Sequence, residues 1–123
     1  MGRISTLVTT VALVLSMSAP GVALERNGNV AIKFAGERDW VAECIFVKAN
    51  GKERKLRRSG RGNSWIDSVG MRGIQGGQCT VTVPEGAKVK VTFEGTGLLV
   101  CPFESGDPCV DHYIEAGEHT FTF

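Results

Sequence analysis

The chain has 123 residues, 42% of them apolar, and its 14 Lys and Arg nearly balance its 13 Asp and Glu. This length suits a single domain, and the sequence contains no internal repeat and no low-complexity tail, which excludes a repeat array. After residue 23, no apolar run approaches the ~20 residues of a membrane-spanning helix, so we expect no membrane span in that part of the chain.

The N-terminus has the pattern of a secretory signal peptide. Arg3 precedes the apolar stretch Ile4–Leu15, and small residues follow that stretch. The stretch is too short for a membrane-spanning helix, which disfavours the alternative of an N-terminal anchor. We therefore predict a signal peptide over residues 1–23 and a periplasmic or secreted mature protein. Residues 24–123 are then expected to form a single β-sandwich domain.

The rest of the sequence shows the alternation of β-strands and no helical period. Val89, Val91 and Phe93 share one face of a strand, for example, and polar residues occupy the positions between them. Such segments, separated by local turns, predict an all-β fold, a small antiparallel β-sandwich or barrel of about 7–9 short strands stapled by two disulfides. The expected strands are Val30–Phe34, Val41–Lys48, Arg54–Arg58, Ser64–Val69, Gln78–Val83, Lys88–Glu94, Leu98–Cys101, Val110–Ile114 and His119–Phe123.

Turn signals separate these strands. Asn50-Gly51 is the preferred pair of a type I′ turn, in which both central residues have positive φ, and it predicts a hairpin over Val41–Arg58. Pro84–Gly86 and Ala116–Glu118 predict two further tight turns. The glycine-rich segment Gly70–Gly77 is expected to be a mobile connection or a bulged edge.

Four cysteines in an exported chain predict a disulfide framework. Cys101 and Cys109 enclose a short loop rich in turn-forming residues, so the ends of this loop are predisposed to meet. Among the possible pairings we therefore favour Cys101–Cys109, which leaves Cys44 to pair with Cys79. This second disulfide is expected to bridge the sandwich.

Charge is distributed unevenly along the chain. Seven Lys and Arg residues lie between Lys48 and Arg61 against Glu53 alone, and no Lys or Arg follows Lys90, whereas six acidic residues do. A cationic strand beside a flexible loop of Gly and Arg suits phosphate, sulfate or carboxylate groups. The alternative is that these cations protect an exposed sheet edge from aggregation. The candidate partner-binding residues are Lys48, Lys52, Arg54, Lys55, Arg57, Arg58, Arg61 and Trp65.

Other chemistry has weaker support. His112 and His119 are the only histidines, no serine lies in a Gly-x-Ser-x-Gly motif, and no free cysteine is expected, so we predict no enzymatic activity. The two histidines and the cysteines Cys101 and Cys109 are possible zinc ligands, but the cysteines lack the spacing of a zinc knuckle. The segment Glu104–Asp111 lacks the ligand spacing of a calcium loop. We therefore expect no metal and no cofactor.

These observations favour an exported binding module that recognises an anionic partner through the basic hairpin. The expected partner is a polymer of the cell envelope or an acidic protein surface, and the second option includes inhibition of a hydrolase such as a lysozyme or a protease. Nucleic acid is not expected, because exported proteins rarely meet it and only Trp65 offers a nearby aromatic ring. The alternatives are an assembly subunit, in which basic hairpins dock on the acidic C-terminal third of the next copy, and, with less support, a small hydrolase.

Overall fold

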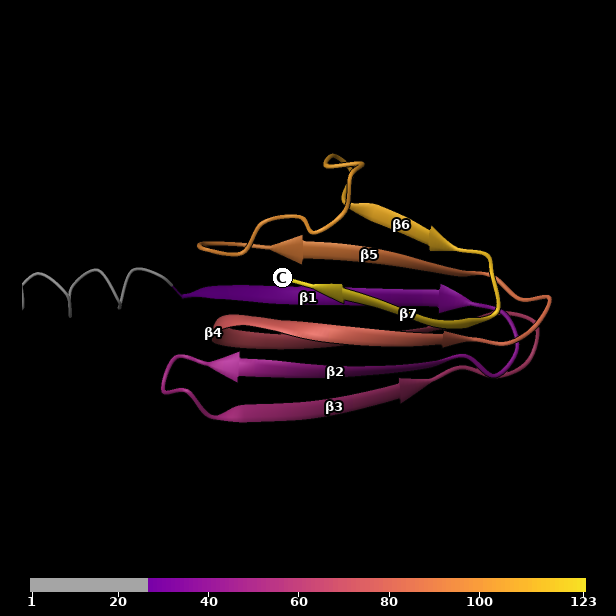
Figure 1. The fold of residues 1–123 in the computed structure, drawn as a ribbon, viewed down its shortest axis with the longest axis horizontal. Helices are drawn as coiled ribbons and strands as arrows, with labels where there is room; N and C mark the ends of the chain where they lie inside the picture. The colour runs from indigo at the N-terminus through magenta and orange to yellow at the C-terminus, as the bar shows by residue number, and fades with distance from the viewer. Residues whose placement is uncertain (1–26) are drawn as a thin grey trace, which may run out of the picture.

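The computed structural model describes residues 27–123, and this part of the chain contains strands, turns and loops without a helix (Figure 1). Accordingly, no helix capable of crossing a membrane occurs among these residues. The predicted signal peptide lies outside the described residues and stays a prediction. The strands are β1 (Gly28–Gly36), β2 (Val41–Lys48), β3 (Glu53–Ser59), β4 (Trp65–Val83), β5 (Val89–Gly95), β6 (Val110–Tyr113) and β7 (Gly117–Thr122).

The strands form one antiparallel sheet in the order β3-β2-β4-β1-β5-β6, with β7 added to β4. The long strand β4 is the common element of this sheet. Its first half, from Trp65 to Ile74, pairs with β1, and its second half, from Ile74 to Thr82, pairs with β2. β7 pairs with the second half of β4 as well. One strand therefore joins two groups of strands, β1-β5-β6 and β3-β2-β7.

The glycine-rich segment Gly70–Gly77 lies inside β4, where the strand passes from one partner to the other. Gly73 has a φ of +65°, which residues with a side chain rarely adopt, and the register between β2 and β4 shifts between Val47 and Lys48. The expected irregularity is therefore present. The expectation of a mobile connection was wrong, because the backbone of this segment continues the strand pairing with β1 and then with β2.

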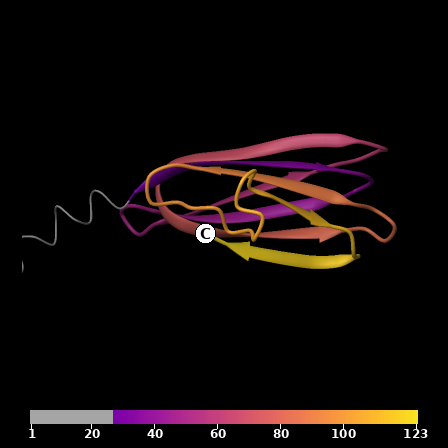
Figure 2. The same ribbon diagram turned by 90° about the horizontal axis from the view of Figure 1, so that it is seen from above.

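The strands enclose one shared core, and Figure 2 shows that they do not lie in a single plane. Phe34, Trp40 and Phe46 are fully buried in this core. The ring of Phe123 connects the two groups, since its centroid lies 5.9 Å from that of Phe46 on β2 and 5.2 Å from that of Phe93 on β5. The predicted class, an all-β antiparallel fold with two disulfides, is confirmed.

Of the predicted strands, one is absent from the structure. Residues 98–101 form a turn and an irregular segment, because Gly97 has a φ of +67° and the Leu99 N–H donates to the Thr96 carbonyl at 3.3 Å. Leu99 is buried between the exposed residues Leu98 and Val100, so the alternation is real, but no neighbouring strand pairs with this segment among the described residues. The other expected strands are present, and two of them are parts of β4.

The hairpin predicted over Val41–Arg58 is confirmed, but its turn differs from the expected type I′. In residues 27–123, Arg38 is the only non-glycine residue with positive φ, so Asn50 does not adopt the required conformation. The Lys48 N–H donates to the Lys52 carbonyl at 2.8 Å and so closes a loop of three residues, Ala49–Gly51. Gly51 alone in this loop has positive φ, and its N–H donates to the Lys48 carbonyl at 2.9 Å. Asn50 contributes through its side chain, whose Oδ1 accepts from the Lys52 N–H at 2.9 Å.

Both disulfides have the favoured pairing, Cys44–Cys79 and Cys101–Cys109. The Cys44–Cys79 disulfide joins the hairpin to a later strand, β4, but the expectation that it would bridge the sandwich was wrong. Cys44 and Cys79 lie directly opposite each other on the neighbouring strands β2 and β4, where both are fully buried. The second disulfide closes the loop that leads into β6. Two disulfides indicate an oxidising environment outside the cytoplasm.

Candidate functional site

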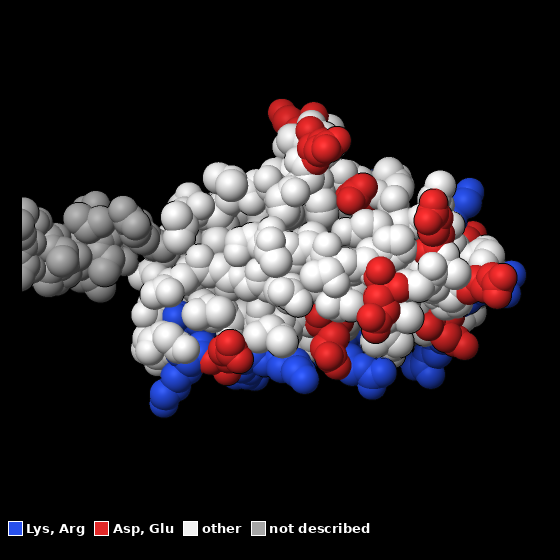
Figure 3. All heavy atoms as spheres, viewed as in Figure 1, with Lys and Arg blue, Asp and Glu red and all other residues white. Residues whose placement is uncertain are grey.

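The basic segment of the sequence forms an edge of the sheet. β3 lies at one end of the strand order and pairs with β2, and four of its seven residues are cations. Figure 3 shows Lys and Arg side chains in a row along the lower margin, where Figure 1 places β3, with some acidic side chains beside them; the charged side chains near β6 in this view are acidic. The charge asymmetry of the sequence is therefore also an asymmetry of the surface.

Strand alternation places two of these cations, Lys55 and Arg57, on the outer face of the sheet. They lie opposite Ile45 and Glu43 of β2, and both are exposed. Lys55 Nζ lies 3.9 Å from Glu43 Oε1, in an exposed pair that water and salt weaken. No ion pair with Arg57 occurs among the described residues. The outer face of β3 therefore presents positive charge that its surroundings compensate only in part.

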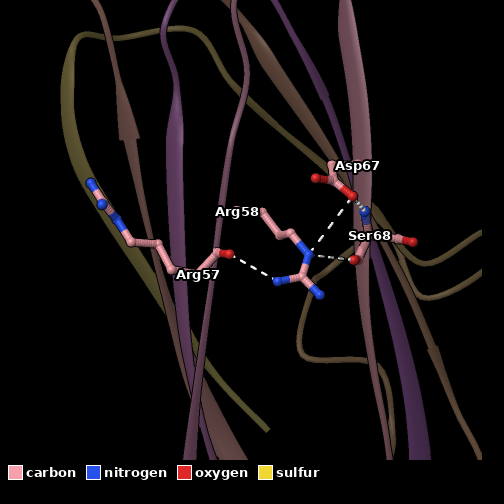
Figure 4. Close-up of polar contacts among 4 residues, drawn as sticks. All are labelled: Arg57, Arg58, Asp67 and Ser68. Carbon is pink, nitrogen blue, oxygen red and sulfur yellow. Dashed lines mark hydrogen bonds and ion pairs between the residues drawn. The ribbon is translucent and has the colours of Figure 1, made fainter.

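Arg58, by contrast, is held by the protein itself. Figure 4 shows its guanidinium extending from β3 to the first half of β4, while Arg57 extends to the other side of the strand. The Arg58 Nε–H donates to the Ser68 carbonyl at 3.1 Å, and Nη1–H donates to the Arg57 carbonyl at 2.9 Å. Asp67 Oδ1 lies 3.8 Å from Nε. Arg58 thus links two strands that are not neighbours in the sheet order, and two of its five N–H donors are occupied.

The tip of the hairpin carries Lys48 and Lys52 and is fixed against β4. The Ala49 N–H donates to the Gly73 carbonyl at 3.1 Å, and the Gln75 side-chain amide donates to the Ala49 carbonyl at 3.0 Å. This contact places the Gly73 backbone beside the tip, and the chain neighbour Arg72 lines a hollow together with Met71 and Glu94. Sequence reasoning missed Arg72 because it treated residues 70–77 as a connection rather than as part of a strand beside the hairpin.

The loop between β3 and β4 is more constrained than its Gly and Arg content suggested. The Gly60 N–H donates to the Trp40 carbonyl at 2.9 Å, and the Arg38 N–H donates to the Gly62 carbonyl at 2.7 Å. Gly60 packs so closely on the Trp40 indole that a Cβ at this position would collide with the ring. These contacts fix the path of a loop that was expected to be flexible.

The fixed loop presents a cation and an aromatic ring together. The guanidinium carbon of Arg61 lies 5.1 Å from the ring centroid of Trp65, a distance at which the ring face attracts the cation. Trp65 is 38% exposed, whereas Trp40 is fully buried, so only one of the two tryptophans is open to a partner. The structure thus keeps Arg61 and Trp65 side by side at the surface.

The two histidines lie away from this edge. His112 is exposed on β6, and the His119 ring on β7 stacks on Tyr113, with centroids 4.5 Å apart and planes at 10°. His119 Nε2 is also 2.7 Å from the Glu115 carbonyl oxygen, which fixes the imidazole in the turn between these strands. No group of three or more His, Cys, Asp or Glu residues able to hold a metal ion occurs within residues 27–123.

Comparisons with known protein families, with curated proteins and with solved structures find no match to this chain. Its function is therefore inferred from the arrangement of its own side chains.

Proposed function

We propose that this protein binds an anionic partner through the cations of the β2–β3 hairpin and the loop that follows it. The observation that carries the proposal is an excess of uncompensated positive charge at one edge. Of the seven cations between residues 48 and 61, only Lys55 and Arg58 have a carboxylate within 4 Å among the described residues. The five others are Lys48, Lys52, Arg54, Arg57 and Arg61.

Protection of a sheet edge would account for the charges on β3 but not for all of them. Arg61 and Trp65 lie in and after the next loop, and Lys48 and Lys52 lie at the hairpin tip, so the positive surface extends beyond the exposed edge. Hydrogen bonds fix both the tip and the loop, and a surface that is already ordered loses less entropy on binding. A positive surface extending beyond the edge on ordered loops favours a binding role.

The partner proposed for an exported protein is an anionic polymer of the cell envelope or an acidic protein surface, including a hydrolase that the protein would inhibit. Arginine presents a planar pair of donors that matches carboxylate, sulfate and phosphate groups. Arg57 is well placed for such a contact because Figure 4 shows its side chain extending away from Arg58 and β4. The proposed function is binding rather than catalysis.

The proposal can be tested by reversing two outer charges, in the variant Lys55→Glu/Arg57→Glu. We expect this change to weaken binding to dextran sulfate and to poly-L-glutamate about tenfold or more, because it replaces two attractive charges by two repulsive ones. A tenfold change corresponds to a loss of about 1.4 kcal/mol of binding free energy. The charge-matched control is Lys33→Glu/Lys90→Glu, which reverses two exposed lysines on β1 and β5. The control is expected to bind almost as the unchanged protein does. Titration calorimetry at low salt measures both.

Two results would count against the proposal. If both variants weaken binding equally, the attraction reflects net charge rather than the hairpin. If the β3 variant binds normally and forms aggregates, the cations serve to protect the edge. Comparing the two polymers also shows whether the surface prefers sulfate to carboxylate groups.

A second candidate function, assembly with copies of itself, is favoured by the strand order. The cationic strand β3 and the strand β6, which follows an acidic loop, lie at opposite ends of the sheet order. Contact between the two ends of successive copies would be head-to-tail and would build a ring or a filament. Size measurement by light scattering at low and high salt tests this, because such an assembly would dissociate as screening increases.

A further inference from the structure

A hollow lies at the opposite end of the sheet from the basic hairpin, between the edge strands β6 and β7. It has a volume of about 590 Å³, and the loop closed by Cys101–Cys109 forms a third wall. β6 pairs with β5 and β7 pairs with β4, so the facing edges of these two strands are not joined by strand pairing. The side chains that line this hollow include Phe103, Glu104, Asp111, Tyr113, His119 and Phe121.

Aromatic rings form much of the wall. Phe103 and Phe121 meet edge to face with centroids 5.0 Å apart, and Tyr113 stacks on His119. Tyr113 and Phe121 are buried, which fixes the positions of their rings. The faces of aromatic rings carry negative charge density and attract cations within about 6 Å of the ring centroid.

Two carboxylates, Glu104 and Asp111, complete the wall of the hollow. The Asp111 side chain is half-buried, and one of its oxygens accepts from the His112 N–H at 2.9 Å. No ion pair involves either carboxylate among the described residues, and no Lys or Arg follows Lys90 in the sequence. Burial, and after it the charge of Asp111, raises the pKa of Tyr113 to about 12, so the negative potential of Asp111 reaches the ring. The hollow is therefore lined by aromatic rings and by two carboxylates that have no ion-pair partner among the described residues.

We propose that this hollow binds an organic cation, an ammonium group carrying alkyl substituents, which packs on the aromatic rings and pairs with Asp111. A neutral apolar ligand would leave the carboxylates without a partner. A bare metal ion would be poorly served, because no group of three or more metal-ligating side chains is present in residues 27–123. A cation with apolar substituents satisfies both the rings and the carboxylates. This site is separate from the proposed basic surface and does not depend on it.

The site can be probed directly because Tyr113 is the only tyrosine in the chain. Its ring resonances, followed by NMR, report on the hollow without interference from another tyrosine. We expect saturable shifts of these resonances on titration with choline, and none with 3,3-dimethylbutan-1-ol, which has the same shape without the charge. A lysine derivative, N-acetyl-lysine methylamide, distinguishes a free small cation from a lysine side chain presented by a protein.

Two variants test the assigned carboxylate. Asp111→Asn keeps the size and the acceptor for His112 but removes the charge, and it is expected to weaken binding of the responding probe at least tenfold. The matched control Glu118→Gln removes a charge from an exposed residue of β7 outside the hollow and should leave binding unchanged. If Asp111→Asn unfolds, Glu104→Gln provides the same test on an exposed residue, with a smaller expected loss.

The results separate into clear outcomes. Binding of choline or of the lysine derivative, lost in Asp111→Asn and kept in Glu118→Gln, supports the site and identifies which source of the cation it prefers. Three results would overturn the proposed cation site. They are equal binding of the neutral alcohol, equal weakening in both variants, and no shift of the Tyr113 resonances with either cation.

Discussion

Arg57 and Arg58 are adjacent in the sequence and have the same side chain, yet the structure gives them different surroundings. Strand alternation turns Arg57 outward and Arg58 toward β4, where its guanidinium donates to the Ser68 carbonyl at 3.1 Å. The opposite directions follow from the alternation of side chains along a strand, which is a local property. The sequence could not predict that the first half of β4 would lie beside β3, because that contact depends on the path of the whole sheet.

This difference predicts that the same substitution lowers stability at Arg58 and weakens partner binding at Arg57. Arg58→Gln should lower the free energy of unfolding by about 1 kcal/mol, since it removes hydrogen bonds from a charged donor that is partly screened by water. Arg57→Gln should change stability by less than about 0.5 kcal/mol, as is usual for exposed sites, but should weaken binding to the anionic polymers. Urea denaturation and calorimetry measure the two effects. Equal losses of stability in both variants would contradict the assignment of Arg58 to a structural contact.

Tyr113 makes stability depend on pH at the alkaline end. Burial, together with the charge of Asp111, raises the pKa of Tyr113 from 10.0 to about 12 in the folded protein. The folded state therefore holds this proton more tightly than the unfolded state does. The resulting stabilisation is fully present below about pH 10 and is lost as the pH rises through about 12. The free energy of unfolding of the unchanged protein should fall more steeply over this range than that of Tyr113→Phe.

Urea denaturation at several alkaline pH values provides this comparison, and the lysines titrate in both proteins, so their contribution cancels. Parallel pH profiles would show that the phenol is not perturbed in the folded state.

At the scale of elements, the strands and their faces were largely predictable because alternation is a local property. The buried positions Val89, Val91 and Phe93 were recognised in this way. β4 was not recognised as one strand of 19 residues, because its central glycines resemble a loop in sequence. Backbone pairing with β1 and β2, which no local pattern reveals, keeps that segment extended.

The two disulfides enclose chain segments of different length, and this predicts unequal contributions to the free energy of unfolding. Cys44 and Cys79 are separated by 35 positions, and Cys101 and Cys109 by 8. Loop-closure entropy then gives about 3.8 kcal/mol for the first disulfide and about 2.5 kcal/mol for the second. Burial of Cys44 and Cys79 adds to the difference, because alanine at these positions leaves a cavity in the core.

We therefore expect the double variant Cys44→Ala/Cys79→Ala to lose more stability than Cys101→Ala/Cys109→Ala. Thermal unfolding under matched oxidising conditions measures both. An equal or larger loss in the second variant would mean that the loop before β6 is more important to the fold than its half-buried position implies.

At the scale of the whole molecule, the fold converts an uneven sequence into separate charged surfaces. The basic residues are clustered along the chain, so the sequence alone assigns them to one region of the molecule, although strand alternation divides the cations of β3 between two faces. Arg72 could not be assigned in this way, because the position of its chain neighbour Gly73 beside the hairpin tip depends on the hydrogen bond between Ala49 and Gly73. The hollow between β6 and β7 could not be predicted either, since it requires three separate segments to meet.

We propose that the hairpin and the following loop form the surface that contacts an anionic partner. The most direct test is an amide NMR titration of the isotopically labelled protein with dextran sulfate at low salt. We expect the largest shifts to fall in residues 48–61, at Trp65 and at Arg72, and to disappear as salt is raised. Shifts centred instead on Lys33 and Lys90, or spread evenly over all lysines and arginines, would contradict the claim.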